Sequence, residues 1–197
     1  MDQKANDDMR INGRRARILT ENIHSVKQRI EKVADGRKVR LIAVSKLKPA
    51  NDILVLHDFP HHHRDFGENY AQELTEKAAL LPPTIQWHMI GALQTNKCKP
   101  LAEQVANLYC VSGVDTVKKA DALEKGRGAL AARLGEGEEG GRLRVLVQVN
   151  TSGGGGEEWG AAWRGGGAVQ ACEGEVSAFG SWGADDYWGV GAESGGC

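Results

Sequence analysis

The pattern of apolar and polar positions in the first 150 residues changes between two periods. Short aliphatic runs, bounded by polar, glycine- or proline-containing segments, predict strands. Five such strands are expected, at residues 39–46, 65–70, 85–91, 108–114 and 143–150. Apolar residues at helical spacing predict helices between them and one before the first. These helices are expected at about 9–35, 49–57, 72–78, 93–105 and from 115 or 116 onward.

This alternation of helix and strand, with short connections, is typical of an α/β protein with a parallel sheet. It fits either a doubly wound sheet or a β/α barrel. In both architectures ligands bind at the carboxyl ends of the strands. Four residues are expected at such ends: Lys46, Asn69, Gly91 and Asn150.

Lys46 ends the first predicted strand and shares one strand face with Ile42 and Val44. A lysine in this position has two interpretations. It points into solvent, as most lysines do, or it lies partly enclosed at the end of an apolar face. Burial lowers the pKa of a lysine and makes the neutral, nucleophilic amine available, which Schiff-base chemistry requires. The location at a ligand-binding strand end leaves the two interpretations about equally supported.

Other polar residues also have a structural and a functional interpretation. Asn69 lies at a strand-to-helix junction, where it either caps the helix or contacts a ligand, and the local sequence slightly favours the cap. A lone histidine in a strand, such as His88, is more often a hydrogen-bonded core residue than a catalyst. The adjacent His61, His62 and His63 are expected in a solvated loop, because neighbours in sequence rarely converge on one metal ion.

Composition divides the chain into two parts. The 197 residues suffice for one domain with a sizeable core, and a net charge of −1 gives no general case for nucleic acid or membrane. Residues 1–150 contain 24 Lys+Arg and 19 Asp+Glu, whereas residues 151–197 contain one basic and seven acidic residues. The second part also contains 15 of the 26 glycines and no lysine, leucine, isoleucine or proline. It has too few aliphatic residues to bury a strand or helix face, so disorder is expected there.

The cysteines are not in metal-site spacing. No C-x-x-C pair is present among Cys98, Cys110, Cys172 and Cys197, so neither a zinc site nor a redox pair is indicated. Scattered free thiols fit a reducing compartment. The N-terminus has no apolar signal-peptide core and no segment approaches a membrane span. A soluble cytoplasmic protein is therefore expected.

Four motifs, in order and at compatible spacing, resemble the pyridoxal phosphate homeostasis protein family, most closely its fungal branch. They are Ala43-Val44-Ser45-Lys46-x-Lys48-Pro49, Arg64-Asp65-Phe66-Gly67-Glu68-Asn69-Tyr70-x-Gln72-Glu73, Trp87-His88-x-Ile90-Gly91-x-Leu93-Gln94-x-Asn96-Lys97 and Val147-Gln148-Val149-Asn150-Thr151-Ser152-Gly153. The resemblance covers roughly residues 10 to 153.

The resemblance implies a single β/α barrel akin to the N-terminal barrel of alanine racemases. It also implies that pyridoxal 5′-phosphate (PLP) is held as an internal aldimine on Lys46. Asn69, His88 and Asn150 match positions on the cofactor side of the barrel. The resemblance further implies a carrier and regulator of PLP, without established catalytic turnover. PLP itself, and PLP-dependent apoenzymes as its recipients, are the implied partners.

The chain departs from this family in its second part. A complete barrel has eight strands and about 250 residues, whereas the pattern here predicts an incomplete barrel of about five strands. The family's late-strand segments, which resemble a barrel phosphate site, have no counterpart in this sequence. We therefore expect a partial barrel over 1–153, a Gly-rich tail over 154–197, an unpaired edge at strand five and a wetted inner face.

Three functions are consistent with these motifs and this composition. The first is PLP binding through Lys46 in intracellular vitamin B6 homeostasis, without turnover. The second is a fragment of a PLP-dependent amino-acid racemase or decarboxylase. Such enzymes need a second, mostly β domain, which nothing in this sequence resembles. The third is an α/β fragment that binds nothing, which the missing phosphate segments favour.

Overall fold

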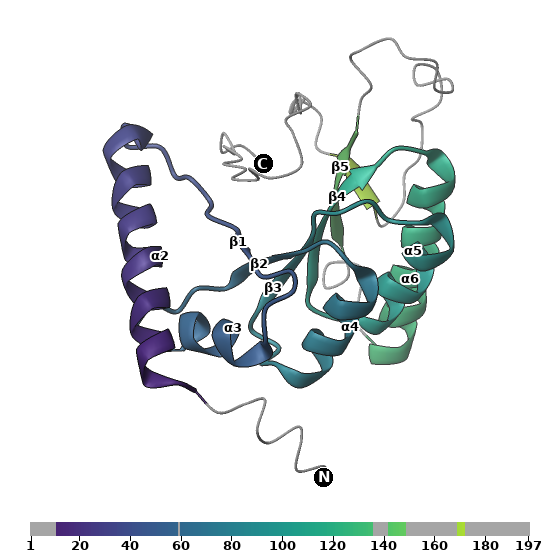
Figure 1. Cartoon of the computed structure of the whole chain (residues 1–197). Coiled ribbons are helices and arrows are strands. Elements are labelled where there is room, and N and C mark those ends of the chain that lie inside the picture. Colours follow the sequence, from purple (N-terminus) through teal and green to yellow (C-terminus); the bar gives the residue numbers. More distant parts are fainter. Residues whose placement is uncertain (1–10, 59, 136–141, 149–168, 172–197) are drawn as a thin grey trace.

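The computed structural model describes residues 11–58, 60–135, 142–148 and 169–171. It contains one parallel sheet in which strand order equals chain order, β1-β2-β3-β4-β5-β6 (Figure 1). The strands are β1 (Ala43–Val44), β2 (Asp65–Glu68), β3 (Gln86–Met89), β4 (Leu108–Val114), β5 (Leu143–Val147) and β6 (Val169–Ala171).

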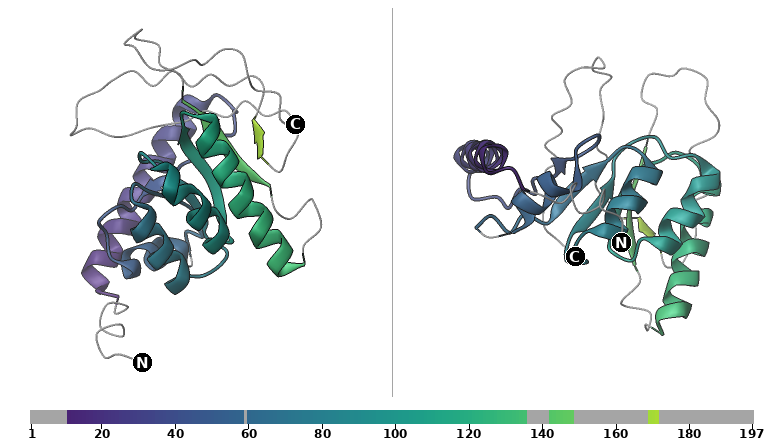
Figure 2. Two further views of the ribbon diagram at one scale, coloured as in Figure 1. Left: turned by 90° about the vertical axis from the view of Figure 1, so that its right-hand side faces the viewer. Right: turned by 60° about the horizontal axis from the view of Figure 1, so that its bottom comes forward.

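Within these ranges, five helices connect or flank the strands. They are α2 (Gly13–Ala34), α3 (Ala50–His57), α4 (Ala71–Leu80), α5 (Thr95–Gln104) and α6 (Val117–Leu134). Helix α2 packs on α3, where Arg15 Nη2 lies 2.8 Å from Asp52 Oδ2. Figure 2 shows α2 at the β1 end of the sheet and α5 beside α6 at the opposite end.

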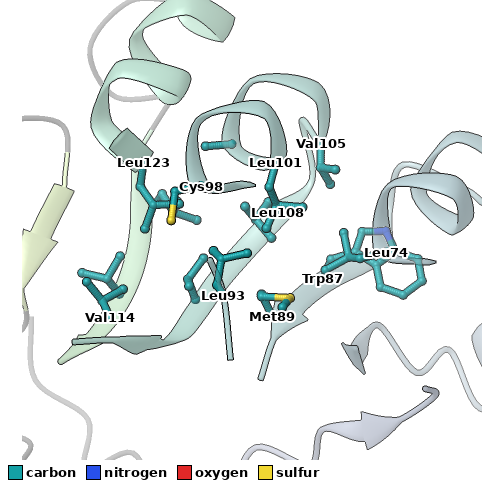
Figure 3. Packing of buried hydrophobic residues seen from close by; sticks show 14 of the residues in the cluster. Leu74, Trp87, Met89, Leu93, Cys98, Leu101, Val105, Leu108, Val114 and Leu123 are labelled. Atoms are coloured by element: carbon teal, nitrogen blue, oxygen red, sulfur yellow. The ribbon is translucent and has the colours of Figure 1, made fainter. Parts of the chain in front are cut away.

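The core lies between one face of the sheet, the outer face, and helices α3 to α6. Trp87, Phe66 and Met89 alternate along β2 and β3 with side chains on this face, and each is at most 1% exposed. Leu74 of α4 and Leu101 of α5 pack against them. Figure 3 shows this packing between strands and helices. Because the apolar residues of both kinds of element meet here, this layer supplies most of the buried apolar area.

The opposite face, the inner face, carries the alternate residues Ile42, Val44, Gly67, His88 and Ile90. Within the described ranges, the helices in the core cluster all pack on the outer face. Val44 is 41% exposed, and Ile42 and Ile90 are half-buried. The expected wetted inner face is therefore confirmed at these residues.

The α/β class and the incomplete barrel with an N-terminal helix are confirmed, since sequential parallel order is the order of a β/α barrel. Two details differ from expectation. The regular part of the first strand is short, covering Ala43–Val44. The expected unpaired edge of strand five is wrong, because β6 pairs with β5 in parallel, Leu143 opposite Val169 and Val145 opposite Ala171. Backbone pairing needs no apolar pattern, which is why this strand in segment 154–197 was not predicted. The rest of that segment lies outside the described residues.

Candidate functional site

A pocket of about 220 Å³ lies at the carboxyl ends of β1, β2 and β3. It is lined by Val44, Lys46, Asn69, Ile90, Gly91 and Ala92. Each contributing segment is the end of a strand or the residues directly after it, as the topology requires. Lys46, Asn69 and Gly91 are thus brought together, as their predicted positions at strand ends indicate.

Two glycines explain how the strand ends approach so closely. A Cβ atom on Gly91 would lie 2.6 Å from the Cα atom of Asn69, so no side chain fits between them. A Cβ atom on Gly67 would lie 2.9 Å from Ile90 Cδ1 and 3.1 Å from Ile42 Cγ2. Ile42 and Ile90 therefore occupy the space over Gly67, next to the pocket, and Gly91 leaves the Asn69 backbone against the third strand end.

Lys46 lies in a tight turn directly after β1. The Lys48 N–H donates to Ser45 O at 3.0 Å, which places Lys46 and Leu47 at the two central positions. Leu47 has φ = 58°, the left-handed region that residues with a Cβ rarely occupy. The strand register continues to the start of this turn, because Ser45 N–H donates to Gly67 O at 2.9 Å. Lys46 is half-buried and its side chain lines the pocket.

A buried polar network lies behind this turn. Lys77 Nζ lies 2.7 Å from Glu68 Oε1, 2.7 Å from Glu73 Oε1 and 2.8 Å from Ser45 O. Ser45 Oγ donates to Glu68 Oε1 at 2.6 Å, and Leu47 N–H donates to Glu73 Oε1 at 2.6 Å. Burial raises the pKa of Glu68, although its hydrogen bonds to Lys77 and Ser45 act in the opposite direction. Sequence reasoning missed this network, because Glu73 and Lys77 look like an ordinary i,i+4 surface pair.

His88 does not lie in the pocket lining. Its Nε2 atom is 2.9 Å from Asp65 Oδ1 and its ring centroid is 5.1 Å from that of Tyr109. The guanidinium carbons of Arg40 and Arg144 lie 4.4 and 4.2 Å from the Tyr109 centroid. Together these five residues form an inner-face cluster at the level where β2 begins.

The charges in this cluster decide the state of Asp65. Burial acts to raise the pKa of Asp65, but the hydrogen bond and charge of His88, with the charge of Arg40, outweigh it. The net pKa is therefore lower than usual, and the carboxylate is ionised at neutral pH. The structure thus groups His88 with Asp65 and Arg40, and does not bring it together with Lys46.

The last predicted site residue, Asn150, lies outside the described residues. The nearest described residue, Gln148, continues the sheet, since its N–H donates to Val114 O at 2.9 Å. Gln148 therefore lies beside the end of β4. The role of Asn150 in binding PLP stays a prediction.

The histidine loop differs from expectation. His63 is buried, its Nε2–H donates to Asp65 O at 2.8 Å and its ring meets Phe66 edge-on, so the expected solvated loop is wrong at this residue. Burial lowers the pKa of His63 to about 4. Among the described residues no group of three His, Cys, Asp or Glu side chains is arranged to hold a metal ion. Cys98 and Cys110 are buried.

None of the helices in the described ranges combines the length and apolarity needed to cross a lipid bilayer. A scan against models of protein families finds no match to the chain.

Comparison with curated proteins does find relatives. The pyridoxal phosphate homeostasis protein of Schizosaccharomyces pombe is 42% identical over 135 residues, which are 66% of this chain and 52% of the relative. The human protein of the same name is 40% identical over 142 residues, 70% of this chain and 48% of the relative. This chain therefore spans about half the length of the curated relatives it matches.

A solved structure of a protein of unknown function from Bifidobacterium adolescentis matches with a TM-score of 0.58 and 28% identity. The match covers 75% of this chain and 61% of that protein, so it supports the fold. The sequence motifs, the parallel strand order and the curated relatives agree. The matched part of this chain is similar in sequence to pyridoxal phosphate homeostasis proteins, as its motifs predict.

Proposed function

We propose that this chain binds PLP through a covalent bond to Lys46 Nζ and acts as a carrier in the homeostasis of that cofactor. One observation supports this most strongly: Lys46 lines a pocket at the carboxyl ends of parallel strands, beside Asn69 and Gly91. This is the location at which barrels of this type bind ligands. The shared name of the relatives gives the ligand.

The pocket-lining residues fit the aldehyde end of such a group. PLP supplies an aldehyde, which condenses with an unprotonated primary amine and releases water. Lys46 supplies the amine, and the Asn69 amide offers a neutral donor and acceptor in the pocket wall. Val44 and Ile90 line the same space with apolar groups. The glycine at position 91 leaves room where a side chain would collide with Asn69.

The pocket also favours binding without turnover. Among its six lining residues in the described part of the chain, Lys46 has the only ionisable side chain. A racemase or decarboxylase needs further acid–base groups at the reacting carbon. We therefore propose a cofactor carrier and not an enzyme. If the purified chain with PLP racemised alanine at a rate above that of Lys46→Ala, this part of the proposal would be wrong.

His88 and Asn150 take different places in this proposal. His88 is assigned to support of the inner face through Asp65 and Tyr109, below the pocket, and not to direct contact with PLP. Asn150 remains a proposed PLP contact from the family motif. We also propose a cytoplasmic location, with PLP-dependent apoenzymes as recipients of the cofactor. The buried cysteines Cys98 and Cys110 suit a reducing compartment.

Reductive trapping tests the proposal. The full chain is mixed with PLP, treated with borohydride, digested, and the modified lysine is located by mass spectrometry. We expect one dominant adduct on Lys46, absent in Lys46→Ala. Lys48→Ala is the matched control, since Lys48 is an exposed lysine two residues away, and it should retain the adduct. Labelling spread over surface lysines such as Lys118 and Lys125 would contradict the proposal.

A further inference from the structure

Both chain neighbours of Lys46 are held by polar contacts from residues that do not line the pocket. Ser45 is held by β2 and α4, and Leu47 is held by α4. Within the described residues, the Lys46 side chain makes no hydrogen bond or ion pair. The direction of its side chain is therefore set by the backbone on either side of it.

On the Ser45 side, three contacts fix the chain. Its N–H donates to Gly67 O at 2.9 Å, its Oγ–H donates to Glu68 Oε1 at 2.6 Å, and its carbonyl oxygen accepts from Lys77 Nζ at 2.8 Å. Ser45 and Glu68 are buried, so these hydrogen bonds have no competition from water. Ser45, which lies between β1 and Lys46, thus has its N–H, hydroxyl and carbonyl groups all hydrogen-bonded.

On the Leu47 side, the contact with Glu73 is the decisive one. The Leu47 side chain is 75% exposed, so apolar packing does not hold this residue. Its left-handed backbone, at φ = 58°, is unfavourable for leucine and needs compensation. The hydrogen bond from Leu47 N–H to Glu73 Oε1, at 2.6 Å, has a charged acceptor and is the contact that provides it.

Lys77 joins the two sides. Its buried ammonium contacts Glu68, Glu73 and the Ser45 carbonyl at 2.7 to 2.8 Å. Burying an ammonium and a carboxylate is unfavourable unless their geometry is good and their remaining hydrogen bonds are satisfied. Here Lys77 Nζ also donates to the Ser45 carbonyl, and Glu73 accepts from Leu47 N–H. The buried charges therefore hydrogen-bond to the turn that contains Lys46.

We propose that Glu73 and Lys77, with Glu68, are positioning residues that clamp the Ser45–Lys48 turn and direct Lys46 Nζ into the pocket. This rests on the proposed function of Lys46 as the PLP-binding lysine. The three residues do not touch the ligand. They act by making Lys46, and not the neighbouring Lys48, the lysine that meets the pocket.

The test measures the ratio of label on Lys46 to label on Lys48 after trapping PLP with borohydride. Glu73→Ala removes the acceptor for Leu47 N–H and one partner of Lys77, and we expect the ratio to fall about tenfold, the scale of one charge-assisted hydrogen bond. Glu73→Gln keeps an acceptor oxygen at the same reach and should stay within about threefold of the wild type. A ratio unchanged in a folded Glu73→Ala chain would overturn the proposal.

Glu76→Ala is the matched control, because Glu76 lies on the same helix and accepts a hydrogen bond from Gln72. It should leave the ratio unchanged. Far-UV circular dichroism shows whether each variant is folded, because unfolding alone would also remove the preference for Lys46. If Glu73→Ala loses its helical signal, the label ratio of the Glu73→Asp variant tests the clamp instead. It keeps an acid in the first turn of α4 but is one methylene too short to reach Leu47, so the ratio should still fall.

A second reagent separates this proposal from the function on which it rests. Acetic anhydride acetylates accessible unprotonated amines and needs no PLP site. If wild type shows no selective PLP adduct while Glu73→Ala still changes the acetylation ratio of Lys46 to Lys48, only the PLP function is wrong. If neither reagent detects a change in the ratio, the clamp is wrong.

Discussion

The two faces of the same sheet differ in what fills them. On the outer face, Phe66, Trp87 and Leu74 are almost completely buried under helices. On the inner face, Val44 is 41% exposed, and the space near the pocket is defined by glycine, lysine and asparagine. Because side chains alternate along a strand, neighbouring residues belong to different faces. We infer that stability depends mainly on the outer face and that the chemistry belongs to the inner one.

The largest effect is expected from Trp87→Ala on the outer face. Trp87 has no exposed surface and its ring centroid lies 6.2 Å from that of Phe66. Removing it leaves a cavity in the core, and the free energy of unfolding should fall by about 3–5 kcal/mol. Urea denaturation followed by circular dichroism measures this. A loss below about 1 kcal/mol would mean that the outer face is not the source of stability.

The next effect is a pH dependence that originates in His63, which packs against Phe66. Its pKa in the folded chain is about 4 against a usual 6.5, because burial disfavours the charged ring. Above pH 6.5 the ring is neutral in both states and stability is complete. As the pH falls from 6.5 to 4, the unfolded chain binds a proton that the folded chain does not, and up to about 3 kcal/mol is lost.

Urea denaturation at a series of pH values between 4 and 7 tests this, with His63→Gln as the comparison. Glutamine keeps an N–H donor for Asp65 O and does not titrate. Other carboxyl groups contribute to the slope in both chains, so the difference between them reports His63. Equal pH slopes for the two chains would contradict the assignment.

The smallest effect is expected from Val44→Thr on the inner face. The substitution is nearly isosteric, both residues favour strands, and position 44 is 41% exposed, so the hydroxyl is not forced into a dry environment. The free energy of unfolding should change by less than about 0.5 kcal/mol. A loss comparable to that of Trp87→Ala would show that the inner face is covered in solution and would end the contrast between the faces.

The strands and the meeting of Lys46 with Asn69 could be predicted, because apolar runs fix the strands and parallel order places their carboxyl ends together. The height of His88 along its strand, relative to the pocket, could not be predicted. Alternation gives the face of a residue and not its height, and two residues along a strand correspond to about 7 Å. His88 shares a face with Ile90 but lies beside Asp65, below the pocket.

The clamp on Lys46 was also hidden from sequence reasoning. Glu73 and Lys77 stand four apart on a helix, a spacing that usually marks a solvated pair. Their burial follows from how α4 packs on β2, and local sequence does not encode that contact. The strand β6 was missed for a related reason, since its pairing with β5 is made by the backbone.

The sequential strand order has a consequence for synthesis on the ribosome. All six residues of the pocket lining lie between positions 44 and 92, and the clamp on Lys46 is complete at Lys77. Chains emerge from the amino terminus onward and domains generally fold in that direction. The pocket-lining residues and the clamp are therefore all translated before β4, β5 and β6.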